Sequence, residues 1–443
     1  MALFEKINVL LLWDDVGKVA STVRANIDAL ARESRFKVFP MSVFGDIPGD
    51  LNIDKFDVVV IHYSLVLSVD AYVSAEFRRR LKNATAIKAV FIQDEYRFVD
   101  RSIAAMRDIG IDLLFTCVPE EEIPKVYPES SLPGVEKVNV LTGYVEDALL
   151  ERILPSYQER RIDIGYRARK VPAWLGELGQ EKWDIGQRVG EDAARYGLAV
   201  DLAYREEERL YGKDWISFLL NCKATLGVES GASVFDFSGD IQAVVEKAAL
   251  DHPEWSFRDL QRKYFLDYEG IIRLNQISPR CFEAAALKTL MILYEGRYSD
   301  RMTPWRHYLP LKKDHSNFAE IVAILRNESK VNDIVDNAYR EVALNPDNSF
   351  AALVRIFDEA ILRRLGSDYV PITDVYSTEA FSSIASQHRE ARIKANRFRA
   401  LMAWGYFFFF GKILGFASES FRDKVQVLLG KYLRPIFRKL LGR

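Results

Sequence analysis

The sequence predicts an α/β protein made of two consecutive doubly wound domains, followed by a helical tail that is both basic and apolar. Short apolar runs alternate with amphipathic segments over the first 145 residues, and the same alternation restarts after residue 160. At 443 residues the chain also exceeds what one hydrophobic core usually organises. Two domains with buried parallel sheets are therefore expected.

The first domain is expected to cover residues 1–150 and to supply six strands. Nearly continuous apolar runs are typical of parallel strands buried on both faces, and the intervening segments, such as 21–34, have the periodicity of crossover helices. The expected strands lie within 7–13, 36–44, 56–64, 87–94, 111–117 and 138–143.

The second domain is expected to cover residues 160–350. A long helix is predicted over 175–197, and a polar insertion with helical character is predicted at 236–270. Residues 351–390 read as closing helices and linker. The expected strands of this domain lie within 162–166, 198–204, 223–229, 289–295 and 307–311.

The tail, residues 391–443, differs in charge from the rest of the chain. It carries 12 Lys/Arg against Glu419 and Asp423, hence about +10, which leaves about −12 on the preceding residues. Its apolar stretch 400–416 is interrupted by Lys412 and is short for a bilayer span of ~20 residues. An acidic body argues against a nucleic-acid partner, and the tail is expected to lie on an anionic membrane surface. Packing on another subunit, in an oligomer, is the alternative.

Cysteine usage indicates the compartment. Cys117, Cys222 and Cys281 lie far apart without a CxxC pair, so neither a zinc site nor a disulfide framework is predicted. A reducing cytoplasm fits, with peripheral attachment to the inner face of the membrane through the tail.

The most informative segment is 275–293. A turn with Pro279 and Arg280 leads into a helix that begins Phe282-Glu283-Ala284, followed by an apolar strand. This resembles the donor-binding segment of two-domain glycosyltransferases of the GT-B fold, group 1 or family 4. The resemblance implies that Glu283 binds the ribose hydroxyls of a nucleotide sugar. It implies that Arg280 either neutralises a phosphate or supports the loop, at a helix N-terminus that also favours an anion. The alternative is that Glu283 is only an acid favoured in a first helical turn.

One position departs from that family. A second Glu commonly stands eight residues before the ribose-binding one, but here that position is Asn275. Our hypothesis is that Glu229, which is followed by Ser230-Gly231-Ala232-Ser233 at the end of an expected strand, replaces the missing acid in catalysis. Ser230 would then contact the donor. An ordinary tight turn is the alternative.

Cations follow the first strand of the second domain. Arg167 and Arg169 lie at the end of the expected strand 162–166, and Lys182 lies in the next helix. The resemblance implies that such cations meet the donor diphosphate and stabilise its departure without a metal ion. A solvated basic turn is the alternative.

The first domain offers polar groups where its expected strands end. His62, Asp94 and Glu95 are expected to face the cleft, because ligands of open α/β sheets bind beyond the carboxyl ends of the strands. Asp94 or Glu95 is a candidate base if the reaction inverts the anomeric centre, and His62 is a candidate to orient a hydroxyl. A capping acid and a packed histidine are the alternatives.

The expected function is transfer of a hexosyl or related group from a nucleotide-diphosphate sugar. The resemblance implies a bacterial enzyme of surface-polysaccharide biosynthesis, with a glycan or lipid-linked acceptor and with no cofactor or metal. Phosphate-loop, zinc-protease, nucleophile-elbow and dinucleotide motifs are absent from the sequence. A sugar-nucleotide epimerase and a non-catalytic binding protein of the same fold remain the alternatives.

Overall fold

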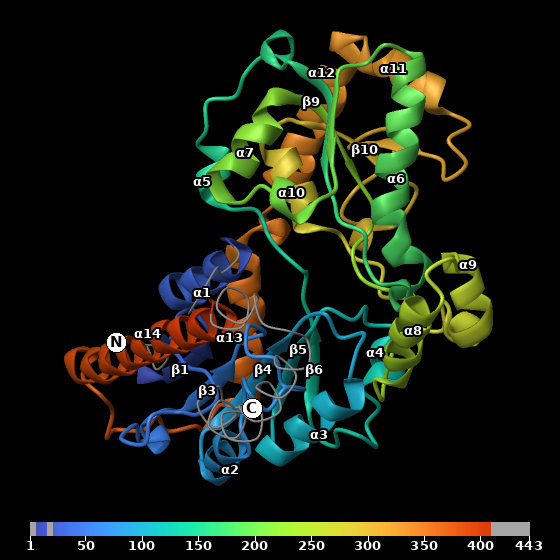
Figure 1. The fold of residues 1–443 in the computed structure, drawn as a ribbon. Helices are drawn as coiled ribbons and strands as arrows, with labels where there is room; N and C mark the ends of the chain where they lie inside the picture. The colour runs from blue at the N-terminus through green and yellow to red at the C-terminus, as the bar shows by residue number, and fades with distance from the viewer. Residues whose placement is uncertain (1–5, 16–20, 409–443) are drawn as a thin grey trace.

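The computed structural model describes residues 6–15 and 21–408, which form two α/β domains joined near residues 145 and 349 (Figure 1). The first domain is blue to cyan in Figure 1, and the second runs from green to orange above it. Each domain contains one parallel sheet with helices on both faces.

The first sheet has the strand order β2-β1-β3-β4-β5-β6, and all its pairings are parallel. Along β1, Val9 and Leu11 enter one core while Leu10 and Leu12 enter the core on the opposite face. Burial on both faces explains the continuous apolar runs. The strands are β1 (Asn8–Trp13), β2 (Lys37–Ser42), β3 (Val58–Ile61), β4 (Ile87–Ile92), β5 (Leu113–Thr116) and β6 (Glu136–Asn139).

The second sheet has the order β11-β10-β9-β7-β8, again with parallel pairings throughout. The first strand of each domain pairs with both the second and the third, so the strand order reverses there. Such a reversal leaves a crevice beyond the carboxyl ends of the strands. The strands are β7 (Ile162–Arg167), β8 (Val200–Ala203), β9 (Cys222–Gly227), β10 (Leu290–Tyr294) and β11 (Leu309–Leu311).

The helices follow the predicted alternation. The long helix predicted over 175–197 is α6 (Gly176–Arg195), and the apolar stretch before β9 is α7 (Gly212–Asn221). The insertion contains α8 (Asp240–Asp251) and α9 (Phe257–Leu260), the latter continuing as a π-helical turn. The other helices that flank the sheets are α1 (Ser21–Glu33), α2 (Ala75–Asn83), α3 (Val99–Ile109), α4 (Ile123–Val126), α5 (Asp147–Leu150), α10 (Pro279–Ala286), α11 (Phe318–Leu325) and α12 (Glu328–Ala338).

Two C-terminal helices return to the first domain, as Figure 1 shows. In α13 (Phe350–Leu365), the Phe357 ring contacts the rings of Phe36, Phe91 and Phe115. In α14 (Thr378–Phe408), the Phe381 ring lies 4.9 Å from that of Phe39. The prediction for the tail falls partly on 409–443, which lie outside the described residues. No helix within 21–408 is long and apolar enough to span a bilayer.

The predicted fold class is confirmed. The described residues form two Rossmann-like, doubly wound domains that face each other across a cleft, the arrangement known as GT-B.

Candidate functional site

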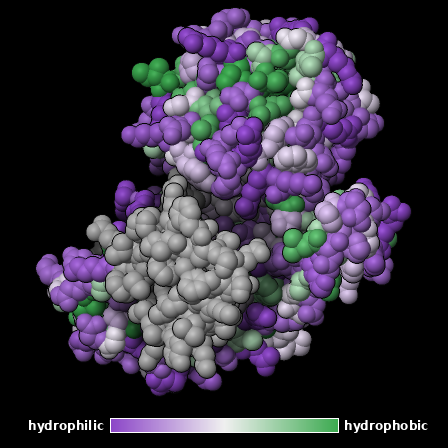
Figure 2. Space-filling model, viewed as in Figure 1, coloured by the Kyte–Doolittle hydropathy of each residue, from purple (hydrophilic) through white to green (hydrophobic). Residues whose placement is uncertain are grey.

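A cleft of about 740 Å³ lies between the two domains, at the carboxyl ends of β7 and β9 and at the start of α10. Figure 2 shows the waist between the domains, where hydrophilic residues predominate on this face. The first domain contributes Thr22, Asp94 and Tyr96 to its walls. Among the predicted residues, the second domain contributes Arg167, Arg169, Lys182, Ser230, Arg280 and Glu283.

Glu283 is held by a tryptophan that the sequence analysis did not single out. The indole nitrogen of Trp215, on α7, donates a hydrogen bond of 2.7 Å to Glu283 Oε2. Burial raises the pKa of Glu283, and the bond from Trp215 acts in the opposite direction. With Oε2 occupied, Oε1 is the oxygen left to accept hydrogen bonds from a ligand in the cleft.

Arg280 lies at the start of α10, where its guanidinium is fixed by two contacts. It donates a 2.6 Å hydrogen bond to the carbonyl oxygen of Arg167, and it lies 4.8 Å from the centre of the Trp215 ring. Ser278 caps this helix and Pro279 occupies its first turn, so the sequence begins the helix at the cleft wall. Trp215 therefore orients both a carboxylate and a cation.

Two further cations face the same space. Lys182 on α6 is near Arg280 and Arg169, while Asp94 approaches it from the first domain. Burial lowers the pKa of Lys182, the two arginines lower it further, and Asp94 opposes them. Arg169 is exposed and has no hydrogen bond or ion pair with another described residue. This group has an excess of positive charge and suits a polyanion.

Arg167 differs from Arg169. Its guanidinium forms a 2.9 Å ion pair with Asp201 and lies 4.1 Å from the centre of the Phe218 ring. Its charge is therefore neutralised within the domain. We assign it a structural role, in which its carbonyl oxygen holds Arg280.

Ser230 lies on the cleft wall in a short antiparallel bridge with Gln276. Its amide donates to the Gln276 carbonyl at 2.7 Å. The next residue, Gly231, has φ of +112°, and a Cβ there would approach the Leu274 oxygen to 1.7 Å. Only glycine fits this turn.

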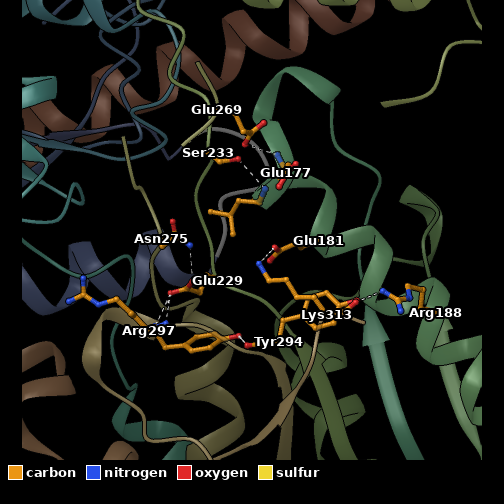
Figure 3. A network of polar contacts seen from close by, with 12 residues as sticks. Glu177, Glu181, Arg188, Glu229, Ser233, Glu269, Asn275, Tyr294, Arg297 and Lys313 are labelled. Carbon is orange, nitrogen blue, oxygen red and sulfur yellow. Dashed lines mark hydrogen bonds and ion pairs between the residues drawn. The ribbon is translucent and has the colours of Figure 1, made fainter. Parts of the chain in front are cut away.

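Glu229 does not line the cleft, contrary to the catalytic role expected for it. Its Oε1 accepts hydrogen bonds from the backbone amides of Arg297 and Tyr298, at 3.1 and 2.8 Å, and its Oε2 accepts one from Asn275 at 2.8 Å (Figure 3). Residues 298–300 all have φ between 50° and 55°. Glu229 thus stabilises a strained turn. Glu229 does lie beside Asn275, as the hypothesis required, but its carboxylate is occupied by hydrogen bonds within the second domain.

Asp94 faces the cleft from the first domain. It follows β4 in the left-handed conformation, with φ of 55°, and Tyr96 donates a 3.1 Å hydrogen bond from its hydroxyl to Asp94 Oδ1. The side chain is exposed. Asp94 and Glu283 are the two carboxylates among the described residues that line the cleft, and they come from opposite domains.

His62 and Glu95 are buried in the first domain. Burial lowers the pKa of His62 to about 3, and its Nδ1 accepts a 3.1 Å hydrogen bond from the Ser64 amide. Glu95 accepts hydrogen bonds from Thr116, the Cys117 amide and the Tyr127 hydroxyl. Neither residue lines the cleft, so the expectation that His62 orients a substrate is not supported.

Among residues 6–15 and 21–408 there is no group of three or more His, Cys, Asp or Glu side chains arranged to hold a metal ion. The three cysteines are buried and unpaired.

No protein-family model and no curated protein matches the chain. Among solved structures, the DNA-modifying β-glucosyltransferase, determined with and without uridine diphosphoglucose, is 12% identical over 80% of this chain and 99% of its own, with a TM-score of 0.49. An α-glucosyltransferase in complex with UDP and DNA is 9% identical over 80% and 99%, with a TM-score of 0.48. TarM is 12% identical over 69% of this chain and 54% of its own, with a TM-score of 0.39, so this chain spans about half of TarM.

Proposed function

We propose that the protein is a glycosyltransferase that uses a nucleotide-diphosphate sugar as donor. One observation carries the proposal. The start of α10 brings Arg280 and Glu283 into a cleft with Lys182 and Arg169, while Asp94 enters it from the other domain. A carboxylate for ribose, cations for a diphosphate and an opposed acid are what this reaction needs from a protein.

On the donor side, Glu283 Oε1 accepts hydrogen bonds from the ribose hydroxyls while Trp215 fixes Oε2. The diphosphate lies against the N-terminus of α10, near Lys182, Arg169 and Arg280. As the bond between the sugar and the phosphate breaks, negative charge grows on the leaving diphosphate. Preorganised cations favour this step because they need no reorganisation.

On the acceptor side, Asp94 takes the proton of the attacking hydroxyl, and the anomeric configuration inverts. The proposal follows from its exposure in the cleft and from its position opposite the donor cations. We propose a glycan or lipid-linked acceptor and no nucleic acid, because the body of the chain outside the tail is acidic.

The cations take the place that a divalent metal holds in other transferases, so we propose that activity needs no metal. We further propose a role in surface-polysaccharide biosynthesis at the cytoplasmic face of the membrane, with residues 391–443 attached to anionic lipid. The composition of that segment supports this location.

A donor screen tests the proposal. We expect calorimetry to show binding of UDP, GDP or one of their sugar conjugates, and we expect Glu283→Ala to weaken that binding. Glu295→Ala is the matched control: it changes a glutamate of the same domain that does not line the cleft, so it should leave the affinity unchanged. Labelled sugar is then offered with glycan, lipid-linked and DNA acceptors, with and without EDTA. Product without acceptor would favour an epimerase, and absence of binding to any donor would favour a non-catalytic protein.

A further inference from the structure

We propose that the insertion 236–270 holds the two domains at a fixed separation and so positions Asp94 opposite Lys182 before any substrate binds. The expected effect on turnover rests on the proposed function, whereas the expected effect on the distance between the domains does not. We call Phe235–Phe237 the strap, because this segment enters the insertion from the second domain and pairs with the backbone of the first.

The strap is bound to the first domain along its backbone. The Asp236 amide donates a 2.8 Å hydrogen bond to the Tyr96 carbonyl, and the Asp100 amide donates a 3.0 Å bond to the Phe237 carbonyl. The Phe235 side chain is buried in the core of the first domain. On the return path of the insertion, Ile272 and Leu274 enter the same core, and Lys125 donates to the Ile271 carbonyl at 3.2 Å.

On the second domain, the insertion and the residues that flank it contact the segment 173–175 and the start of α6. Ser233 Oγ accepts a 3.1 Å hydrogen bond from the Leu178 amide, and Glu269 Oε1 accepts a 3.0 Å bond from the Glu177 amide. Arg258 pairs with the Glu177 carboxylate. Figure 3 shows Ser233 and Glu269 beside the start of this helix. These bonds satisfy amides that the first turn of a helix leaves unpaired.

On each domain, the insertion contacts an element that carries a residue of the cleft. Tyr96, whose carbonyl receives the strap, donates its hydroxyl to Asp94, and α6 carries Lys182. The insertion, which projects at the right of Figures 1 and 2, thus ties the turn that bears the proposed base to the helix that bears a phosphate-binding cation. The domains also meet elsewhere, at the bridge between Val145 and Ser349, at the 2.6 Å hydrogen bond from the Thr142 hydroxyl to the Ile277 carbonyl, and at the ion pair of Arg297 with Glu121. Several separate contacts restrict hinge motion more than one does.

Asp236 is the residue through which this arrangement can be tested. Its side chain is 1% exposed and caps α8, with Oδ1 accepting from the Gly239 amide and Oδ2 from the Gln242 amide, both at 2.8 Å. Asp236→Ala removes both bonds and frees the strap from α8. Asp236→Asn retains one acceptor oxygen. Lys247→Ala, which removes only an exposed ion pair with Asp251, is the matched control in the insertion.

The experiment uses the full chain with spin labels at Lys82→Cys and Asp333→Cys, exposed positions on α2 and α12. The native cysteines are buried, so labelling is directed to the new thiols. We expect a narrow interdomain distance distribution that UDP leaves unchanged. Asp236→Ala should broaden it, Asp236→Asn should give an intermediate width, and Lys247→Ala should not alter it.

Kinetics provide the second readout. A displacement of the base by an ångström costs about 100-fold in turnover, so kcat of Asp236→Ala should fall by about 10- to 100-fold while the Kd for UDP stays within about threefold. Thermal unfolding confirms that each variant is folded. If Asp236→Ala does not fold, Lys125→Met should broaden the distribution instead, because it removes the hydrogen bond to Ile271 of the second domain. The same change also removes an ion pair with Glu122, which lies within the first domain.

An unchanged distribution in the folded variants would overturn the inference, as would a wide distribution in the wild type that narrows with UDP. A wild type that binds no nucleotide would contradict the proposed function instead, while the distance measurement would still decide the role of the strap.

Discussion

At the scale of single residues, the donor site depends on a hydrogen bond between Trp215 and Glu283, residues separated by 68 positions in the sequence. Trp215→Phe keeps a ring beneath Arg280 but removes the indole donor. We expect the Kd for UDP to rise by about fivefold, since one such bond contributes about 1 kcal/mol. Calorimetry measures this Kd, and Trp183→Phe is the control because Trp183 does not line the cleft. Equal affinities of the two variants for UDP would show that Trp215 does not contribute to donor binding.

Asp94 has a different signature, because a general base acts on turnover and not on donor affinity. Asp94→Asn keeps the shape of the side chain and removes its basicity, so kcat should fall by about 100- to 10,000-fold with little change in the Kd for UDP. Steady-state rates with a saturating donor check this. Asp100→Asn, also exposed and in the first domain, is the control. Full activity in Asp94→Asn would exclude it as the base.

Glu229 should act on stability. Glu229→Ala leaves the Arg297 and Tyr298 amides and the Asn275 amide group without their carboxylate partner. The free energy of unfolding should fall by about 2–4 kcal/mol, because each buried group left unsatisfied costs about 1–3 kcal/mol. Denaturant titration measures this. Activity per folded molecule at low temperature should be close to that of the wild type, and its loss without any loss of stability would restore the catalytic interpretation.

At the scale of elements, the sequence predicted the sheets well and the direction of side chains poorly. Each segment that was expected to be a strand overlaps one, because parallel strands are buried on both faces. The ends shifted, as in β6, which occupies Glu136–Asn139 and not 138–143. The cluster of Arg169, Lys182, Arg280 and Glu283 could be anticipated from strand ends and a helix start.

The remaining site residues depended on contacts that no local pattern encodes. Glu229 lies at a strand end, but its carboxylate turns toward residues 297 and 298, across 68 and 69 positions of sequence. His62 also ends a strand, and yet its ring is fully buried. Trp215 was not singled out in the sequence, and it reaches Glu283 only because α7 packs beside α10. Strand position identifies which backbone reaches the cleft, whereas packing decides which side chain points into it.

The ends of β4 and β5 are joined by Glu95, which gives this part of the sheet a pH dependence. Burial raises the pKa of Glu95 to about 7 from 4.5, against hydrogen bonds from Thr116, Tyr127 and Cys117. Since the folded pKa is the higher one, the stabilisation is complete below about pH 4.5 and is lost as the pH rises through about 7. The melting temperature should therefore fall from pH 5 to pH 8 by more in the wild type than in Glu95→Gln. Parallel pH profiles of the two would contradict this.

At the scale of the whole molecule, the described residues on either side of the second domain belong to the same first domain. Phe357 of α13 packs among Phe36, Phe91 and Phe115, and Asp358 accepts hydrogen bonds from Ser34 and the Arg35 amide. The first domain therefore completes its core with residues that follow the second in sequence. An isolated segment 1–150 would therefore lack the part of this core that α13 supplies.

The packing of α14 on the first domain determines which basic residues are left to bind a membrane. Arg389 pairs with Asp15, and Arg392 pairs with Asp14 and bonds to Ser42, so these two arginines are used within the protein. Residues 409–443 contain eight of the twelve basic residues of the tail. The proposed attachment to lipid should therefore depend on that segment.

Sedimentation with vesicles tests this attachment. The full chain should bind vesicles that contain phosphatidylserine and should be released as salt rises, because each basic residue near the surface contributes about 1 kcal/mol that salt screens. A chain that ends at residue 408 should stay in the supernatant. It should keep its melting temperature and its affinity for UDP, since the cleft lining and the four core clusters of the described residues lie in the retained part. If the chain bound neutral vesicles as strongly as anionic ones, the apolar residues of the segment would account for the attachment instead. Concentration-dependent self-association that is lost with the segment, in place of vesicle binding, would assign it to a second copy of the chain.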